Sequence, residues 1–166
     1  DVAVLVINGM DGVQGHTRTL WKLLERYGIP VFFFFNKMDQ PGADREALLS
    51  EIRSEFGDGC LDFTDADSKE WYENAALCGE DLLEEYLREG TISRESLTKA
   101  VAERRMFPCY FGSALKMRGV REFLDGFVTY TAPRTYQKAF GAKVFKVGRD
   151  ARGVRLTYLK VTGGSL

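Results

Sequence analysis

The stretch "FFFFNKMDQPG", residues 32–42, decides how this sequence folds. Four phenylalanines run directly into an asparagine, a lysine and an aspartate, which prefer water or a polar partner. A short apolar run that ends in turn residues is typical of a strand buried on both faces of a parallel sheet. We therefore predict a buried strand at residues 31–35, with the polar residues emerging at its tip.

Strand-like and helix-like segments alternate around this strand. Residues 2–7 (VAVLVI) form another short β-branched run. Residues 17–27 carry apolar side chains at helical spacing and are followed by the helix-stopping residues Gly28 and Pro30. Residues 44–56 show a second amphipathic helical pattern. The order strand, helix, strand, helix with short connections predicts an α/β fold with a parallel sheet.

The middle of the chain interrupts this alternation. Residues from 57 to about 73 are polar and acidic without a clear period, so we expect irregular structure there. Helices are predicted at residues 79–89 and 93–105, the second with two arginines suited to the negative end of the helix dipole. The alternation then resumes with a strand at residues 107–111 and a helix over residues 120–128.

The pattern changes again after residue 132. Residues 142–147 and 154–162 are two strand-like runs around the turn-forming sequence RDARG, residues 149–153. Two strands joined by a turn do not continue an alternating α/β pattern. We therefore place a domain boundary near Pro133.

The composition excludes several classes of protein. The 166 residues include 45% hydrophobic residues, enough for a packed core, and 23 Lys and Arg balance 24 Asp and Glu, so no global basic field favours nonspecific nucleic-acid binding. The three cysteines, Cys60, Cys78 and Cys109, include no CxxC pair, which argues against a disulfide framework and a zinc site. Because no apolar stretch approaches the roughly 20 residues that span a bilayer, we expect a cytoplasmic protein without a membrane partner.

Asn36, Lys37 and Asp39 stand where ligands bind in open parallel sheets, beyond the carboxyl end of a strand. The carboxylate of Asp39 can accept two parallel hydrogen bonds, and guanine presents two such donors side by side, N1–H and N2–H. Adenine has an acceptor at N1 and would leave the carboxylate unpaired. Asn36 can donate to the purine N7 and accept from the loop backbone, and Lys37 can lay its methylene stem across the base.

The letters NKxD are the guanine-specificity signature of GTP-binding proteins, and a second signal accompanies them. Ser113, Ala114 and Leu115 directly follow the predicted strand at residues 107–111. GTP-binding proteins carry a similar SAK or SAL element there, whose backbone N–H groups reach the guanine O6. Since both elements stand at strand ends and in the correct order, we predict that Asn36, Lys37, Asp39 and these three residues bind guanine nucleotide.

On these motifs the chain resembles the translational GTPases, particularly elongation factor G and, more closely, the ribosome-protection tetracycline-resistance proteins. The resembling segments are AVLVINGMDGVQGHTRTLW, GIPVFFFFNKMDQPGAD, EDLLEEYL, FPCYFGSALKMRGV and GAKVFKV. The resemblance implies the C-terminal part of a P-loop GTPase domain at residues 1–132, with an inserted subdomain at about 57–106. Residues 133–166 would be the first strands of the antiparallel β-barrel second domain of these factors.

The motifs that perform phosphoryl transfer in this family are not in the sequence. It contains no GxxxxGK[ST] phosphate loop and no DxPGH segment. In the family order these motifs precede Asp1, so we expect an internal fragment without catalytic residues or metal ligands of its own. The resemblance implies GTP or GDP as ligand, with Mg²⁺ bound in the intact protein only, through residues absent here. We expect the fragment alone to be inactive.

The resemblance implies a ribosome-stimulated GTP hydrolase, with ribosomal RNA and proteins as partners. Tetracycline-resistance ribosomal protection is our main reading; elongation factor G proper and a release-factor-type GTPase stay open. So do a guanine-nucleotide sensor that does not hydrolyse GTP and a ribosome interaction module. Lys116 and Arg118 either touch nucleotide or RNA or are ordinary surface residues. Without the phosphate-loop strand, an exposed sheet edge predicts self-association.

Overall fold

The computed structural model describes residues 1–64, 66–132 and 136–164. The chain divides into two compact units, Asp1–Ala132 and Pro133–Leu166. The predicted boundary near Pro133 lies outside the described residues.

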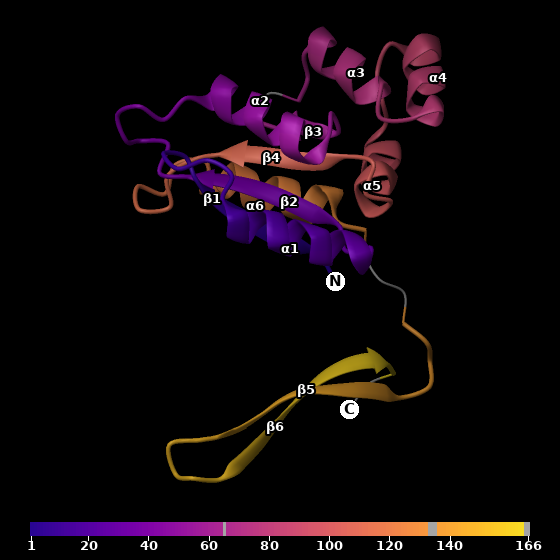
Figure 1. Ribbon diagram of the computed structural model, residues 1–166. Coiled ribbons are helices and arrows are strands. Elements are labelled where there is room, and N and C mark those ends of the chain that lie inside the picture. Colours follow the sequence, from indigo (N-terminus) through magenta and orange to yellow (C-terminus); the bar gives the residue numbers. More distant parts are fainter. Residues whose placement is uncertain (65, 133–135, 165–166) are drawn as a thin grey trace. The chain divides into compact units, whose positions relative to one another are not determined.

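The first unit is a parallel sheet with flanking helices (Figure 1). Its strands are β1 (Ala3–Asn8), β2 (Val31–Asn36), β3 (Cys60–Asp62) and β4 (Phe107–Phe111). Its helices are α1 (Gly15–Arg26), α2 (Arg45–Phe56), α3 (Lys69–Ala76), α4 (Glu80–Glu89), α5 (Arg94–Ala102) and α6 (Val120–Tyr130). The strands are ordered β1-β2-β4-β3 and pair in parallel throughout. The predicted α/β class with a parallel sheet is confirmed.

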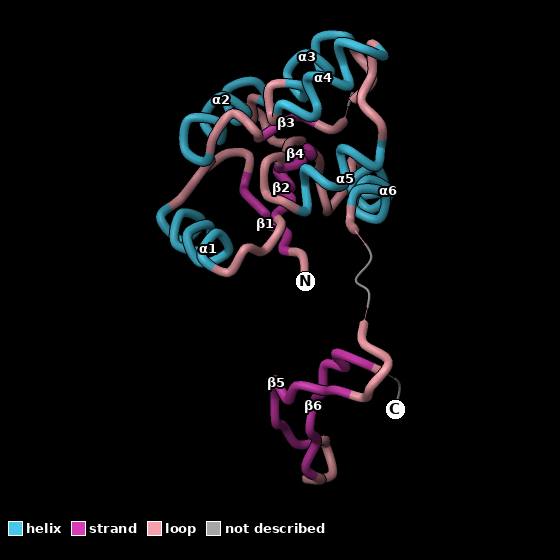
Figure 2. Tube along the Cα trace, turned by 90° about the vertical axis from the view of Figure 1, so that its right-hand side faces the viewer, coloured by secondary structure: helices cyan, strands magenta, loops and turns pink. Residues whose placement is uncertain are grey.

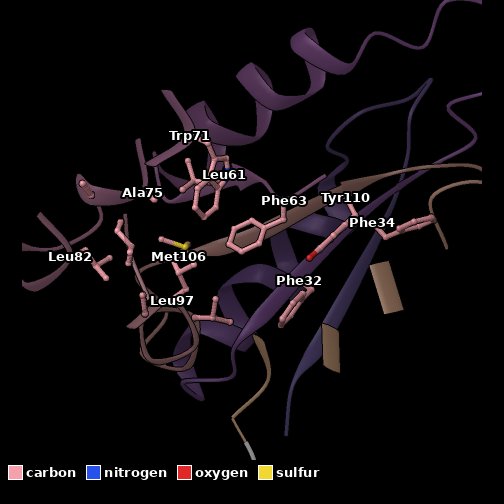
Figure 3. Close-up of a cluster of buried hydrophobic side chains, with 14 residues drawn as sticks. Phe32, Phe34, Leu61, Phe63, Trp71, Ala75, Leu82, Leu97, Met106 and Tyr110 are labelled. Atoms are coloured by element: carbon pink, nitrogen blue, oxygen red, sulfur yellow. The ribbon is translucent and has the colours of Figure 1, made fainter. Parts of the chain in front are cut away.

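The four phenylalanines of β2 are buried on both faces of the sheet, as a double-faced strand requires. Phe32 and Phe34 belong to one hydrophobic cluster, shown in Figure 3, and Phe33 and Phe35 belong to the other. Figure 2 shows α1 and α2 on one side of the strands and α5 and α6 on the other. The alternating side chains of one strand therefore hold both helical layers.

The expected irregular structure from residue 57 to about 73 is wrong in two places. The structure has the short strand β3 at Cys60–Asp62, and helix α3 begins at Lys69. The side chain of Ser68 caps this helix by accepting from the backbone N–H of Trp71 at 3.1 Å. A three-residue strand is too short to show a period in the sequence, and it is defined by its pairing with β4.

The helix predicted at residues 93–105 is shorter than expected, because α5 ends at Ala102. Arg104 has a positive φ of 59° and places its guanidinium 4.7 Å from the ring centroid of Trp21, and Arg105 pairs with Asp81 at 3.0 Å. Both arginines lie just beyond the last turn of the helix, whose own basic residue is Lys99, and their interaction with the helix dipole stays a prediction. Both side chains connect elements that are distant in sequence.

The second unit contains an antiparallel hairpin of β5 (Gly141–Arg149) and β6 (Arg155–Gly163). Its turn is held by Asp150, whose Oδ1 accepts from the backbone N–H groups of Arg152 at 2.8 Å and Val154 at 2.9 Å. Gly153 has a φ of 81°, which a glycine adopts without strain. The two strands expected in this part of the chain are present, and their membership of a barrel stays a prediction.

Strand β1 forms one edge of the sheet, and the side chain of Val6 on it is 62% exposed. The predicted self-association through this edge stays a prediction. Within the part of the chain that the structure describes, no helix is long and apolar enough to cross a membrane.

Candidate functional site

Two loops meet at the carboxyl edge of the sheet because the strands that carry them are parallel neighbours. Phe35 of β2 and Phe111 of β4 pair in register, and their rings stack with centroids 4.7 Å apart and planes 8° apart. Strand β2 ends one residue after Phe35, at Asn36, and β4 ends at Phe111, so the two loops begin beside each other. The buried ring pair therefore sets the spacing of the two loops.

The side chain of Asn36 joins the loops. Its Oδ1 accepts from the backbone N–H of Lys37 at 2.8 Å and from that of Ala114 at 2.9 Å, although Ala114 is 78 positions away in the sequence. Backbone hydrogen bonds reinforce this link, since Met38 N–H donates to the Gly112 carbonyl at 3.0 Å and Gly112 N–H donates to the Phe35 carbonyl at 2.9 Å. The amide of Asn36 thus has a bracing function that is independent of any ligand.

The second loop is a tight turn closed on itself. Ser113 and Arg118 form an isolated antiparallel bridge, with their N–H groups donating to each other's carbonyls at 2.9 and 3.0 Å. Glycine is required at both ends: a Cβ on Gly112 would clash with the Arg118 carbonyl, and one on Gly119, whose φ is 72°, would clash with the Phe111 carbonyl. The sequence between these glycines is therefore held in one shape.

Asp39 is the carboxylate on which both loops converge. The hydroxyl of Ser113, which is buried, hydrogen-bonds to it, and Lys116 Nζ lies 2.9 Å from its Oδ2. These two partners, first the Ser113 hydrogen bond and then the Lys116 ammonium, lower the pKa of Asp39 to about 2. The carboxyl group is therefore fully ionised at neutral pH.

The remaining predicted residues lie on the surface of the loops. Lys37 is exposed and has a φ of 66°, in the left-handed region that a β-carbon disfavours. The side chain of Leu115 is 92% exposed at the turn of the second loop. Five of the six predicted residues take part in direct hydrogen bonds, Asn36 with the backbone N–H groups of Lys37 and Ala114, and Asp39 with Ser113. Lys37 and Leu115 flank them with side chains available to cover a flat ligand.

The sequence prediction left out Gly112 as a site residue and did not assign Lys116 a partner. Gly112 had a sequence signal, since it stands between a buried strand and a polar turn. The pairing of Lys116 with Asp39 had none, because the two residues are 77 positions apart and meet only once β2 and β4 are side by side. The assembled site offers an ionised carboxylate, an amide and backbone N–H groups, which suits a planar heterocycle with adjacent N–H donors.

Comparison with known proteins places this geometry in a family. The profile of the Elongation factor Tu GTP binding domain matches residues 1–133. Across its whole length the chain is 32% identical to the tetracycline resistance protein TetW of Butyrivibrio fibrisolvens and 27% identical to TetO of Streptococcus mutans. It is 29% identical to TetM from transposon Tn5251 of Streptococcus pneumoniae. The chain spans 29% of the length of each of these relatives.

The fold has a counterpart among solved structures. A protein from Thermus thermophilus superimposes with a TM-score of 0.80 at 23% identity, over 99% of this chain and 32% of that one. This likeness concerns the fold. Because the family profile covers the sheet, both loops and the segment between them, the chain belongs to the family of the elongation factor Tu GTP-binding domain.

Proposed function

We propose that this chain supplies the guanine-recognition loops of a GTP-binding, GTP-hydrolysing translation factor that acts on the ribosome. The observation that carries this proposal is the convergence of Asn36, Asp39 and Ala114 at one sheet edge from two loops. Asp39 accepts from the guanine N1–H and N2–H, and the Asn36 amide nitrogen donates to N7. The backbone N–H groups at Ala114 and Leu115 face O6, the Ala114 N–H being shared with Asn36.

The wider assignment rests on the family and the relatives. We propose that residues 1–132 are part of a GTP-binding domain with an insertion at about 57–106, and that residues 133–166 begin a β-barrel domain. Hydrolysis belongs to the intact protein, which binds Mg²⁺ through residues outside this chain. The similarity to TetO, TetW and TetM supports ribosome-protection tetracycline resistance as the role. Elongation and release remain the alternatives.

Titration calorimetry with guanosine, GDP and ADP tests the recognition of guanine. We expect guanosine and GDP to bind and ADP not to bind. The Asp39→Asn variant should lose guanosine binding, because one carboxylate oxygen is replaced by an amide donor that faces the guanine donors. Equal binding of ADP and GDP would refute the assignment. GTP turnover by the purified chain above a protein-free blank would contradict its inactivity.

The hairpin supports a ribosomal partner. Cross-strand register places Arg149 opposite Arg155, and like charges facing each other destabilise a strand pair in isolation. Residues 136–164 hold one acidic residue, Asp150, against seven basic ones: Lys138, Lys143, Lys146, Arg149, Arg152, Arg155 and Lys160. A polyanion such as ribosomal RNA would relieve this repulsion.

Salt-dependent RNA binding tests the ribosomal part of the proposal. We expect the chain to bind a ribosomal RNA fragment with an affinity that falls steeply as salt rises, and the double variant Lys143→Ser, Arg155→Ser to reduce that slope by roughly two. The matched control is Lys69→Ser with Arg88→Ser, which removes the same charge from exposed positions on α3 and α4. Equal slopes for both double variants would contradict the assignment of the hairpin.

A further inference from the structure

Lys116 holds the carboxylate that the proposed function assigns to guanine. Its Nζ lies 2.9 Å from Oδ2 of Asp39, and the two side chains are 49% and 16% exposed, respectively. The backbone N–H of Lys116 also donates to the Ser113 hydroxyl oxygen at 3.4 Å. The lysine is thus anchored at its backbone in the second loop while its ammonium reaches across to the first.

The ammonium and a guanine base would compete for the same oxygen atoms. Guanine offers N1–H and N2–H side by side and needs one lone pair on each carboxylate oxygen, in the plane of the carboxylate. Ser113 already hydrogen-bonds to this group, and Lys116 covers Oδ2. With 16% of the Asp39 side chain exposed, little of the carboxylate is open for a base to approach while the ammonium stays in place.

The ammonium of Lys116 can leave Asp39 at a small cost in free energy. Its side chain is half exposed, so water solvates the ammonium when it leaves. The loop that carries it is fixed by the Ser113–Arg118 bridge, so the lysine can change rotamer without disturbing the backbone N–H groups of Ala114 and Leu115. Displacing the ammonium therefore breaks one partly exposed ion pair and leaves the other hydrogen bonds of the two loops in place.

We propose that Lys116 is an internal competitor that occupies Asp39 until a base with two adjacent donors displaces it. This inference rests on the proposed function, because it needs Asp39 to be the guanine ligand. Either base must break this pair to reach Asp39, so the pair weakens guanine and adenine binding by the same factor, and the choice between the two bases rests on the donors that guanine returns to Asp39. Lys116 therefore sets the affinity of the site for a base, while Asp39 sets the choice of base.

The test uses neutral nucleosides, so that no phosphate charge attracts the lysine. Guanosine and adenosine are titrated into the whole chain and into the Lys116→Met variant, which keeps the aliphatic stem. The matched control is Arg121→Met, which removes one positive charge from α6 near the second loop and disturbs only the exposed pair with Asp125. We expect Lys116→Met to bind guanosine about two- to fivefold more tightly while leaving the preference for guanosine over adenosine unchanged, and Arg121→Met to change neither the affinity nor the preference.

Salt provides a second readout in the unmodified chain. Because salt screens an exposed ion pair, guanosine binding should strengthen as salt rises, and this trend should vanish in Lys116→Met. Unchanged or weaker guanosine binding in Lys116→Met, with binding intact in the unmodified chain, would overturn the competitor and leave the guanine site standing. Failure of every variant to bind guanosine would refute the proposed function and the competitor together.

Discussion

Two substitutions of Asn36 separate its bracing of the loops from its recognition of a base. Asn36→Ala removes the acceptor that bonds to Lys37 N–H at 2.8 Å and Ala114 N–H at 2.9 Å. A hydrogen bond of this kind contributes about 0.5–1.5 kcal/mol net, so two of them contribute about 1–3 kcal/mol to the free energy of unfolding. Asn36→Asp keeps an oxygen in the same place and should preserve both bonds.

The two variants should therefore differ in their free energy of unfolding, and both should fail to bind guanosine. Asn36→Asp should unfold near the unmodified chain, yet fail to bind guanosine because a carboxylate cannot donate to N7 and repels it. Asn36→Ala should lose both properties.

Urea denaturation followed by tryptophan fluorescence measures the first difference, since Trp21 and Trp71 are buried in the first unit. With a urea dependence of about 1–3 kcal/mol per M, a loss of about 2 kcal/mol moves the midpoint by about 1 M. Calorimetry with guanosine measures the second. Equal destabilisation by alanine and aspartate, or a change below about 0.5 kcal/mol for alanine, would refute the bracing role.

Three further predictions follow from the site. Gly112→Ala should destabilise the chain by about 1–3 kcal/mol in the same urea assay, because the new Cβ meets the Arg118 carbonyl. The control is Gly15→Ala at the start of α1, where the new Cβ meets nothing within 4 Å. This control should be neutral or stabilising by up to about 1 kcal/mol. Because the folded pKa of Asp39 is depressed to about 2, its contribution to stability is complete above the ordinary value of 3.8 and is lost as the pH falls through 2. Carboxyl ¹³C NMR should show this titration, and Ser113→Ala and Lys116→Met should each raise the pKa of Asp39; an unchanged pKa in either variant would contradict the role of that partner. Phe35→Leu removes a ring stacked at 4.7 Å on its β4 partner, so guanosine affinity should fall severalfold with little change in the pKa of Asp39.

Local patterns in the sequence predicted the half of the site that depends on strand ends. The run of phenylalanines gave β2, and the polar residues after β2 and β4 lie together because parallel neighbours end at one edge. The apolar spacing of residues 44–56 likewise agrees with α2, whose N-cap Asp44 accepts from two backbone N–H groups.

What the sequence missed depends on contacts between distant segments. The pair of Lys116 with Asp39 has no local signature. Helical periodicity continued past Ala102 because Arg104 is compatible with a helix, yet its guanidinium stacks on Trp21 and donates to the Ile29 carbonyl. Strand β3 has three residues and therefore no measurable period.

The position of β4 also governs when the loops come together during protein synthesis. β4 is the last strand of this sheet to be made. Because β2 borders it on one side and β3 pairs with it on the other, β4 must enter between β2 and the segment that becomes β3. At about 5–20 residues per second, the ribosome needs roughly 4–14 s to extend the chain from Asn36 to Phe107. For that time β2 presents an unpaired, apolar edge, a hazard for a nascent chain. Guanosine binding therefore reports the final strand insertion, and a chain that binds the nucleoside has completed its sheet.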